Sequence, residues 1–212
     1  QKTAYEISLG LVGSEMCIRD RSFTLRLGQK APEFNLISTS KEKVSITSFD
    51  SIFLVFFFTC NHCPYVTGSD EVTRQTANKF RDKDVSFIAI NSNSANTYQE
   101  DSFENMVLRM EEYNFPWVYL HDADQEIALK YGALKTPHFY VFNEQRELIY
   151  TGRGVDSPLD ANKIKINNLE LVLDELTSNT LISIPITNPI GCSVKWEGKD
   201  SHWMPPEACD LI

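Results

Sequence analysis

A continuous apolar run, "IFLVFFF" at residues 52 to 58, limits the possible folds of this chain more than any other stretch. A strand with one face in water alternates apolar and polar residues, and this run has no polar position. Both faces of this strand must therefore be shielded from water by other parts of the protein. This is typical of a central strand in a sheet that carries helices on each side. The run predicts a domain built around a buried sheet.

Further elements follow along the chain. Apolar and β-branched runs predict strands at residues 85 to 90, 117 to 122, 138 to 143 and 147 to 153. Apolar residues at helical spacing predict helices at residues 64 to 83, 101 to 114, 122 to 133 and 161 to 179. A polar turn between the last two strands indicates an antiparallel hairpin, while the alternation before it implies parallel pairing. The predicted fold class is α/β, a three-layer α/β/α sandwich with a mixed central sheet.

Two of the predicted helices begin with a capping pattern. Asp101 with Glu104, and Asp122 with Gln125, have the spacing of an N-cap residue and its partner in the first turn. Both acids are therefore expected at helix N-termini. The charges of "QED" at residues 99 to 101 are interpreted as solvated helix surface.

The chain divides into three segments. Residues 1 to 21, "QKTAYEISLGLVGSEMCIRDR", resemble the translation of a sequencing-library adapter and are interpreted as non-native and disordered. Residues 22 to 179 contain every predicted strand and helix and are expected to form one domain. Residues 180 to 212 contain four prolines and no periodic pattern. They are expected to form an irregular tail that wraps back on the domain.

Composition and charge exclude several kinds of partner. The net charge of −9 argues against nucleic acid, whose phosphates attract clustered Lys and Arg. No apolar run approaches the roughly 18 residues that a membrane helix needs, so no membrane contact is expected. With Cys17 set aside, four cysteines remain, which is few for a secreted protein held by disulfides. We therefore expect a cytoplasmic protein in which the closely spaced cysteines have a special role.

Cys60 and Cys63, in "FTCNHCPYV", lie three residues apart where the first predicted strand meets the following helix. Residues at this spacing share a helix face, so the two sulfurs can meet. Free N–H groups and the positive end of the helix dipole lower cysteine pKa values there to about 3.5–7.5. A protonated His62 would stabilise a thiolate further. Pro64 fits the first helical position and would make Cys63 the cap, but Cys60 also fits the attacking role, so the nucleophile stays open.

Two other interpretations of the cysteine pair fit less well. A zinc site needs two more soft ligands at suitable spacing, and Cys192, His202 and Cys209 form no second C-x-x-C. A structural disulfide across so short a loop adds little stability. A C-x-x-C beside a βαβ pattern instead favours a redox-active disulfide, so we predict no metal site and no organic cofactor.

Six stretches carry a resemblance to known proteins, and they are "LGQKAPEFNL", "FTCNHCPYV", "AINSNSANTYQEDSFENM", "YGALKTPHFYVF", "TGRGVDSP" and "NPIGCSVKW". In order and spacing they resemble the thioredoxin-like superfamily, and more closely its peroxiredoxin-like redoxin proteins that carry a C-x-x-C. The resemblance implies a thioredoxin fold with extensions and makes Cys60 and Cys63 the redox pair. It also implies that Thr136 and Pro137 form the loop whose proline is cis and packs beside the disulfide. Cys192 is then either an extra exchange cysteine or a plain tail cysteine.

Together, these residues and the resemblance predict a thiol–disulfide oxidoreductase. Its partners would be protein or small-molecule disulfides and a cellular thiol reductant. A first alternative is a thiol-dependent peroxidase acting on peroxides, because Cys63 and Pro64 resemble the peroxidatic cysteine and proline of peroxiredoxins. Those enzymes carry a proline and a threonine seven and three residues earlier, where this chain has Phe56 and Cys60. A second alternative is a redox-inactive binding module that keeps the thioredoxin fold.

Overall fold

A seven-stranded mixed sheet forms the middle layer of the fold in the computed structural model, which describes residues 23 to 200 and 203 to 205. The adapter-like segment 1 to 21 lies outside these residues. The strand order is β2-β1-β5-β4-β3-β7-β8. The strands are β1 (Asn35–Ser38), β2 (Lys43–Ser45), β3 (Phe53–Thr59), β4 (Val85–Asn91), β5 (Val118–His121), β7 (His138–Phe142) and β8 (Leu148–Gly152).

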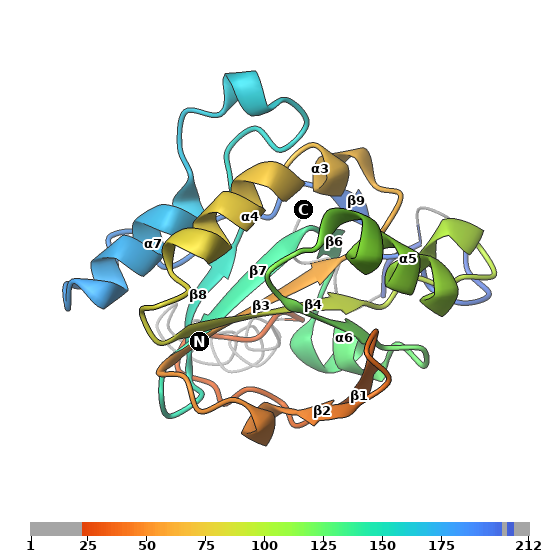
Figure 1. Ribbon diagram of the computed structural model, residues 1–212, viewed down its shortest axis with the longest axis horizontal. Coiled ribbons are helices and arrows are strands. Elements are labelled where there is room, and N and C mark those ends of the chain that lie inside the picture. Colours follow the sequence, from red (N-terminus) through yellow and green to blue (C-terminus); the bar gives the residue numbers. More distant parts are fainter. Residues whose placement is uncertain (1–22, 201–202, 206–212) are drawn as a thin grey trace, which may run out of the picture.

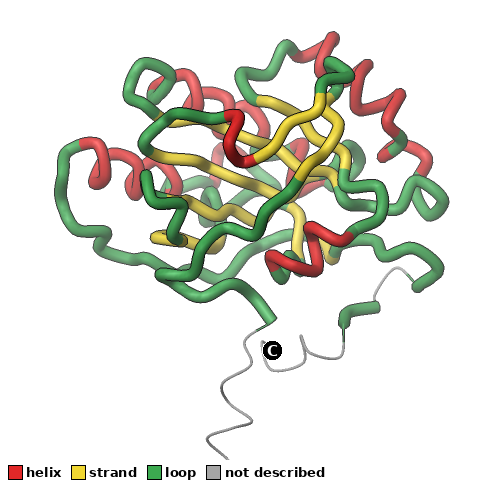
Figure 2. Tube along the Cα trace, turned by 90° about the horizontal axis from the view of Figure 1, so that it is seen from below, coloured by secondary structure: helices red, strands yellow, loops and turns green. Residues whose placement is uncertain are grey.

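Helices cover both faces of this sheet, and the view turned by 90° shows the strands inside a shell of helices and loops (Figures 1 and 2). The helices are α3 (Pro64–Thr67), α4 (Asp70–Lys79), α5 (Phe103–Tyr113), α6 (Glu126–Tyr131) and α7 (Asn168–Thr177), with 3-10 turns η1 (Ile46–Ser48), η2 (Gln99–Asp101) and η3 (Ala161–Lys163). The predicted three-layer α/β/α sandwich is confirmed. None of the described helices is long and apolar enough to cross a membrane.

The apolar run of the sequence forms the centre of the sheet. Strand β3 pairs parallel with β4 and antiparallel with β7, and every residue after Phe53 is buried. Phe56 and Phe58 pack on the side of α6, whereas Val55 and Phe57 pack on the side of α4, α5 and α7. Each fully buried side chain of this size contributes about 1.5–3 kcal/mol. The strand therefore fixes both layers of the core and ends at the functional site.

Pairing in the rest of the sheet follows the predicted order. Strand β4 pairs parallel with β5, and β7 with β8 forms the predicted antiparallel hairpin. The antiparallel hairpin of β1 and β2 at the other edge was not predicted. Its strands have only four and three residues, too few for a clear alternation of apolar and polar positions.

Helix boundaries differ from the predictions throughout, and the helix predicted at 122 to 133 spans only Glu126–Tyr131. The helix predicted at 64 to 83 is split into α3 and α4 at Gly68 and Ser69, where Ser69 has φ −111° and ψ −1°. A Cβ atom at Gly68 would lie 2.5 Å from the carbonyl oxygen of Pro158. The helix predicted at 161 to 179 begins only at Asn168, after Asn167 caps it. The helix predicted from Asp101 begins after Ser102.

The capping predictions for Asp101 and Asp122 have different outcomes. The hydroxyl of Ser102 accepts the first-turn N–H of Asn105, so Asp101 is not the cap of α5. The carboxylate of Asp122 accepts N–H groups of Ile127 and Ala128 in α6 at 3.1 and 2.9 Å. It therefore does satisfy free N–H groups at the start of that helix.

The C-terminal tail packs back on the domain. It forms strand β9 (Cys192–Ser193), which pairs antiparallel with β6 (Lys135–Thr136) in a two-stranded sheet. Beyond β9, Val194 and Trp196 are buried in the core. The described part of the tail is otherwise mostly without regular structure, and it brings Cys192 to the end of β3. His202 and Cys209 lie outside the described residues.

Candidate active site

The two cysteines of the C-x-x-C lie between the end of β3 and the start of α3. Cys63 is the N-cap residue of α3, and Pro64 occupies the first helical position. The N–H groups of Val66 and Thr67 donate to the Cys63 carbonyl at 2.9 and 3.0 Å. Cys60 is 1% exposed and Cys63 is 0% exposed, and both are free thiols. The predicted strand-to-helix junction and the position of the proline are confirmed.

The loop of Thr136 and Pro137 lies against both sulfurs. The peptide bond between these residues is cis, as the resemblance implied. The Thr136 hydroxyl lies 3.5 Å from the Cys60 sulfur. The Thr136 carbonyl oxygen lies 3.4 Å from the Cys63 sulfur, which can donate to it when protonated. One residue of the loop thus contacts both members of the pair.

The two sulfurs differ strongly in acidity. The hydrogen bond from the Cys60 thiol lowers the pKa of Cys63; burial opposes this, but donors on Cys192 and the N–H of Tyr65 bring the pKa to about 4. Burial raises the pKa of Cys60 well above its usual value, and the hydrogen bond that it gives to Cys63 and the charge of Asp101 raise it further. Cys63 is therefore the sulfur that ionises first, and this favours Cys63 as the nucleophile that the sequence left open.

A titration of the reduced protein checks this assignment. As pH is lowered from about 8, we expect the ultraviolet absorbance of one thiolate to persist until it disappears near pH 4. An ordinary cysteine thiol has a pKa of about 8.5. The sign follows from the lowered pKa, since the charge is present above it and lost as pH falls through it. The acidic step should be absent in Cys63→Ser. A thiolate step near pH 8 that Cys63→Ser removes would contradict the assignment.

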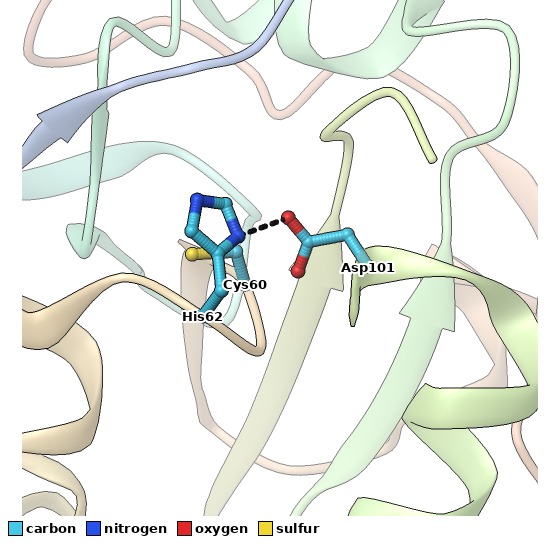
Figure 3. A group of neighbouring side chains, drawn as sticks. All are labelled: Cys60, His62 and Asp101. Carbon is cyan, nitrogen blue, oxygen red and sulfur yellow. Dashed lines mark hydrogen bonds and ion pairs between the residues drawn. The ribbon is translucent and has the colours of Figure 1, made fainter. Parts of the chain in front are cut away.

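A buried carboxylate, that of Asp101, lies beside the C-x-x-C turn, and the ring of His62 points toward it (Figure 3). Asp101 is 0% exposed. Its oxygens accept the backbone N–H of Asn61 at 2.6 Å and the side-chain amide of Asn93 at 2.8 Å. A third partner is Nδ1 of His62, at 2.7 Å. The interpretation of "QED" as solvated surface is therefore wrong for Asp101, because the turn η2 folds over the site and buries this side chain.

His62 is the ionisable partner of that carboxylate. Its ring stacks on Tyr98, with centroids 4.1 Å apart and planes 7° from parallel. Burial alone lowers the pKa of His62, but the hydrogen bond and charge of Asp101, with smaller contributions from Cys63 and Glu100, raise it above its usual value. An imidazolium at this position favours a thiolate on the neighbouring Cys63.

Three atoms of this network have the spacing of a metal site. The Cys60 sulfur, a ring nitrogen of His62 and a carboxylate oxygen of Asp101 lie within 4.8 Å of one another. Figure 3 shows the sulfur beside the His62 ring, which points toward Asp101. Both oxygens of Asp101 already accept hydrogen bonds from Asn61 and Asn93. The geometry therefore fits a hydrogen-bonded network better than a set of metal ligands.

Cys192 completes the cluster of sulfurs. It stands opposite Thr136 in the register of β9 and β6, and it packs against Cys60, Cys63 and Val66 while remaining partly exposed. Burial, together with the hydrogen bond that it gives to Cys63, raises the pKa of Cys192 to about 11. Every sequence-predicted site residue thus lies in one place. Asp101 was missed, because the local sequence around it is polar and carries no sign of burial.

Comparison with known proteins agrees with this architecture. The Redoxin family model matches residues 26 to 169. An uncharacterized conserved protein from Geobacillus kaustophilus is 37% identical, with a TM-score of 0.78 over 84% of this chain and 95% of its own. A hypothetical protein from Sinorhizobium meliloti 1021 is 28% identical, with a TM-score of 0.78 over 83% and 97%.

A third structure shares the fold at lower identity. The thioredoxin domain of a thiol-disulfide oxidoreductase from Bacteroides vulgatus is 18% identical, with a TM-score of 0.53 over 60% of this chain and 89% of that domain. No curated protein sequence matches significantly. The thioredoxin-like fold implied by the resemblance is therefore confirmed.

Proposed function

The chain belongs to the Redoxin family, which supports a thiol redox role, and we propose that it is a thiol–disulfide oxidoreductase whose reversible couple is Cys60 and Cys63. One observation carries the proposal: Cys60 and Cys63 pack in one buried cluster, and the hydroxyl and carbonyl oxygens of Thr136 lie 3.5 and 3.4 Å from their sulfurs. In this cluster the pKa of Cys63 is lowered to about 4 and that of Cys60 is raised, so an acidic sulfur lies beside a sulfur that keeps its proton. This is the arrangement that thiol–disulfide exchange requires, namely a thiolate to attack and a second thiol to resolve.

The reaction follows from the acidity of the two sulfurs. The Cys63 thiolate attacks one sulfur of a substrate disulfide, and the other substrate sulfur leaves as a thiolate that takes up a proton. Cys60 then loses its proton and attacks the Cys63 sulfur, which releases the second half of the substrate as a thiol. The substrate gains two electrons and two protons, and the protein is left with a Cys60–Cys63 disulfide. A cellular thiol reductant restores the dithiol, and no bound organic cofactor enters this cycle.

Equilibration against glutathione tests this function. We expect Cys60 and Cys63 to interconvert between dithiol and disulfide in a single two-electron step as the ratio of reduced to oxidised glutathione changes. The fractions are measured by acid quenching, alkylation and peptide mass spectrometry. Cys63→Ser should form no such disulfide at any ratio. A wild-type pair that remains entirely reduced, or entirely oxidised, across the range would instead support the alternative of a redox-inactive binding module.

Burial of the sulfurs favours one second candidate, a thiol-dependent peroxidase. Cys60 and Cys63 are 1% and 0% exposed, so a small peroxide can reach them more easily than a protein disulfide can. The Cys63 thiolate would take one peroxide oxygen as a sulfenic acid and release water. Condensation with Cys60 would then give the disulfide and a second water. Peroxide consumption with a thiol donor, lost in Cys63→Ser, would favour this candidate.

A further inference from the structure

Access to the redox pair is controlled by the residues that cover it. Both sulfurs of the C-x-x-C are buried, and among partly buried apolar side chains Tyr65 and Cys192 pack against their cluster. Cys192 is therefore a sulfur of this cluster that also faces solvent in part.

The position of Cys192 is set by an unusually close backbone approach. Strand β9 places Cys192 opposite Thr136, the residue that touches the sulfurs of both Cys60 and Cys63. A Cβ atom at the preceding Gly191 would lie 2.1 Å from the Thr136 carbonyl oxygen, so no side chain fits there. Glycine at that position is what lets the tail come this near to the pair.

The chain is anchored directly after Cys192. The N–H of Val194 donates to the Leu134 carbonyl at 3.1 Å, and the N–H of Lys195 donates to the side chain of Asn93 at 2.9 Å. Gln125 donates to the Lys195 carbonyl at 2.9 Å. The residues that follow Cys192 therefore fix its position. The side chain of Asn93, which accepts from Lys195, also donates to Asp101.

The Cys63 sulfur has a thiol neighbour on each side. Cys60 and Cys63 belong to one buried cluster, and Cys192 packs against that cluster from its place opposite Thr136. Donation from the thiol of Cys60 and from the thiol and N–H of Cys192 is what lowers the pKa of Cys63. Either neighbour is therefore in contact with the sulfur that would carry a mixed disulfide. Packing alone does not distinguish Cys60 from Cys192 as the partner of Cys63.

Charge distinguishes the two neighbours once a substrate is bound. A mixed disulfide removes the negative charge of Cys63 and with it the repulsion that holds protons on both neighbours. Cys60 still faces the buried carboxylate of Asp101, which disfavours its thiolate. Cys192 faces Lys135 and Lys195, whose charges favour its thiolate. The outer cysteine is then the easier one to ionise.

We propose that Cys192 is a third redox cysteine of this site, which resolves the mixed disulfide on Cys63 and passes the resulting bond to Cys60. The Cys192 thiol gives up its proton and attacks the Cys63 sulfur, the bond from Cys63 to the substrate breaks, and the substrate leaves as a thiol. Cys60 next attacks the Cys63 sulfur, which forms Cys60–Cys63 and returns Cys192 to a thiol without further loss of electrons. This inference rests on the proposed function and adds an intermediate to it.

Trapping the intermediate tests the proposal. In Cys60→Ser treated with oxidised glutathione, peptide mass mapping should find an intramolecular Cys63–Cys192 disulfide, two hydrogens lighter than the dithiol. In the matched control, Cys60→Ser with Cys192→Ser, glutathione should stay bound to Cys63. Glutathione that also stays on Cys63 in the single variant, with Cys192 still a thiol, overturns the proposal. Acid quenching of wild type at short times gives an independent check, since Cys63–Cys192 should appear before Cys60–Cys63.

Two replacements of Cys192 separate exchange from hydrogen bonding. Cys192→Ser keeps a hydroxyl donor for the Cys63 sulfur, whereas Cys192→Ala removes it. Only the alanine variant should raise the pKa of Cys63, while both should slow steady-state reduction of a disulfide. Wild-type turnover in Cys192→Ser overturns the proposal. A wild-type Cys60–Cys63 couple that still equilibrates with glutathione in that case shows that the proposed function stands and only the third cysteine fails.

Discussion

Replacing Cys63 with serine should abolish reduction of disulfides by this protein. A serine hydroxyl forms no disulfide, and the sulfur it replaces is the one whose thiolate persists down to about pH 4. Cys60 cannot take over, because burial and the charge of Asp101 keep its pKa high. The loss should be complete and measured as the initial rate of thiol release from a small disulfide substrate.

A matched variant at the other end of the motif shows whether the roles are assigned correctly. Cys60→Ser retains the attacking sulfur, so it should release the first substrate thiol at close to the wild-type rate. Both serine variants bury a hydroxyl in place of a thiol and should lose a similar stability, about 1–3 kcal/mol, in chemical unfolding. The assignment fails if Cys63→Ser still releases a first thiol and Cys60→Ser does not.

Replacing Asp101 with asparagine should cause the largest loss of stability among single changes at the site. The carboxylate accepts from Asn61, Asn93 and His62 while fully buried. An amide has one accepting oxygen, so its NH₂ group must face a donor, the amide of Asn93 or the N–H of Asn61. We expect the free energy of unfolding to fall by about 2–4 kcal/mol, measured by denaturant unfolding.

The control for Asp101→Asn removes one negative charge from the adjacent residue, Glu100. Glu100 is exposed, so Glu100→Gln should change the free energy of unfolding by no more than about 0.5 kcal/mol. A similar loss in both variants would mean that net charge, and not the buried network, determines the effect.

The dependence of this loss on pH follows from His62. The pKa of His62 is raised in the folded protein. The ion pair with Asp101 therefore contributes its full stability at pH values below the unfolded pKa of about 6.5. That part is lost as pH rises through the folded pKa. The difference in unfolding free energy between wild type and Asp101→Asn should therefore be largest in mild acid and shrink above that range. A difference that grows with pH would contradict a charged His62.

Residues adjacent in the chain were sufficient to predict the centre of the fold. An unbroken apolar run had to be covered on both faces, and β3 is the central strand it predicted. The place of the C-x-x-C after that strand, with Pro64 in the first helical position, follows from preferences of the local backbone. The strands β6 and β9 were not predicted, because two residues each are too few for a pattern.

The site itself depended on contacts between distant segments. Asp101 lies in a polar stretch that predicts exposure, and only the turn η2 folding over Asn61 and His62 buries it. The sequence by itself determined a buried sheet that ends in a pair of cysteines at a helix start. Only the tertiary structure decided that Cys63 is the acidic sulfur and that Cys192 touches it, because acidity depends on which donors and charges surround a sulfur in space.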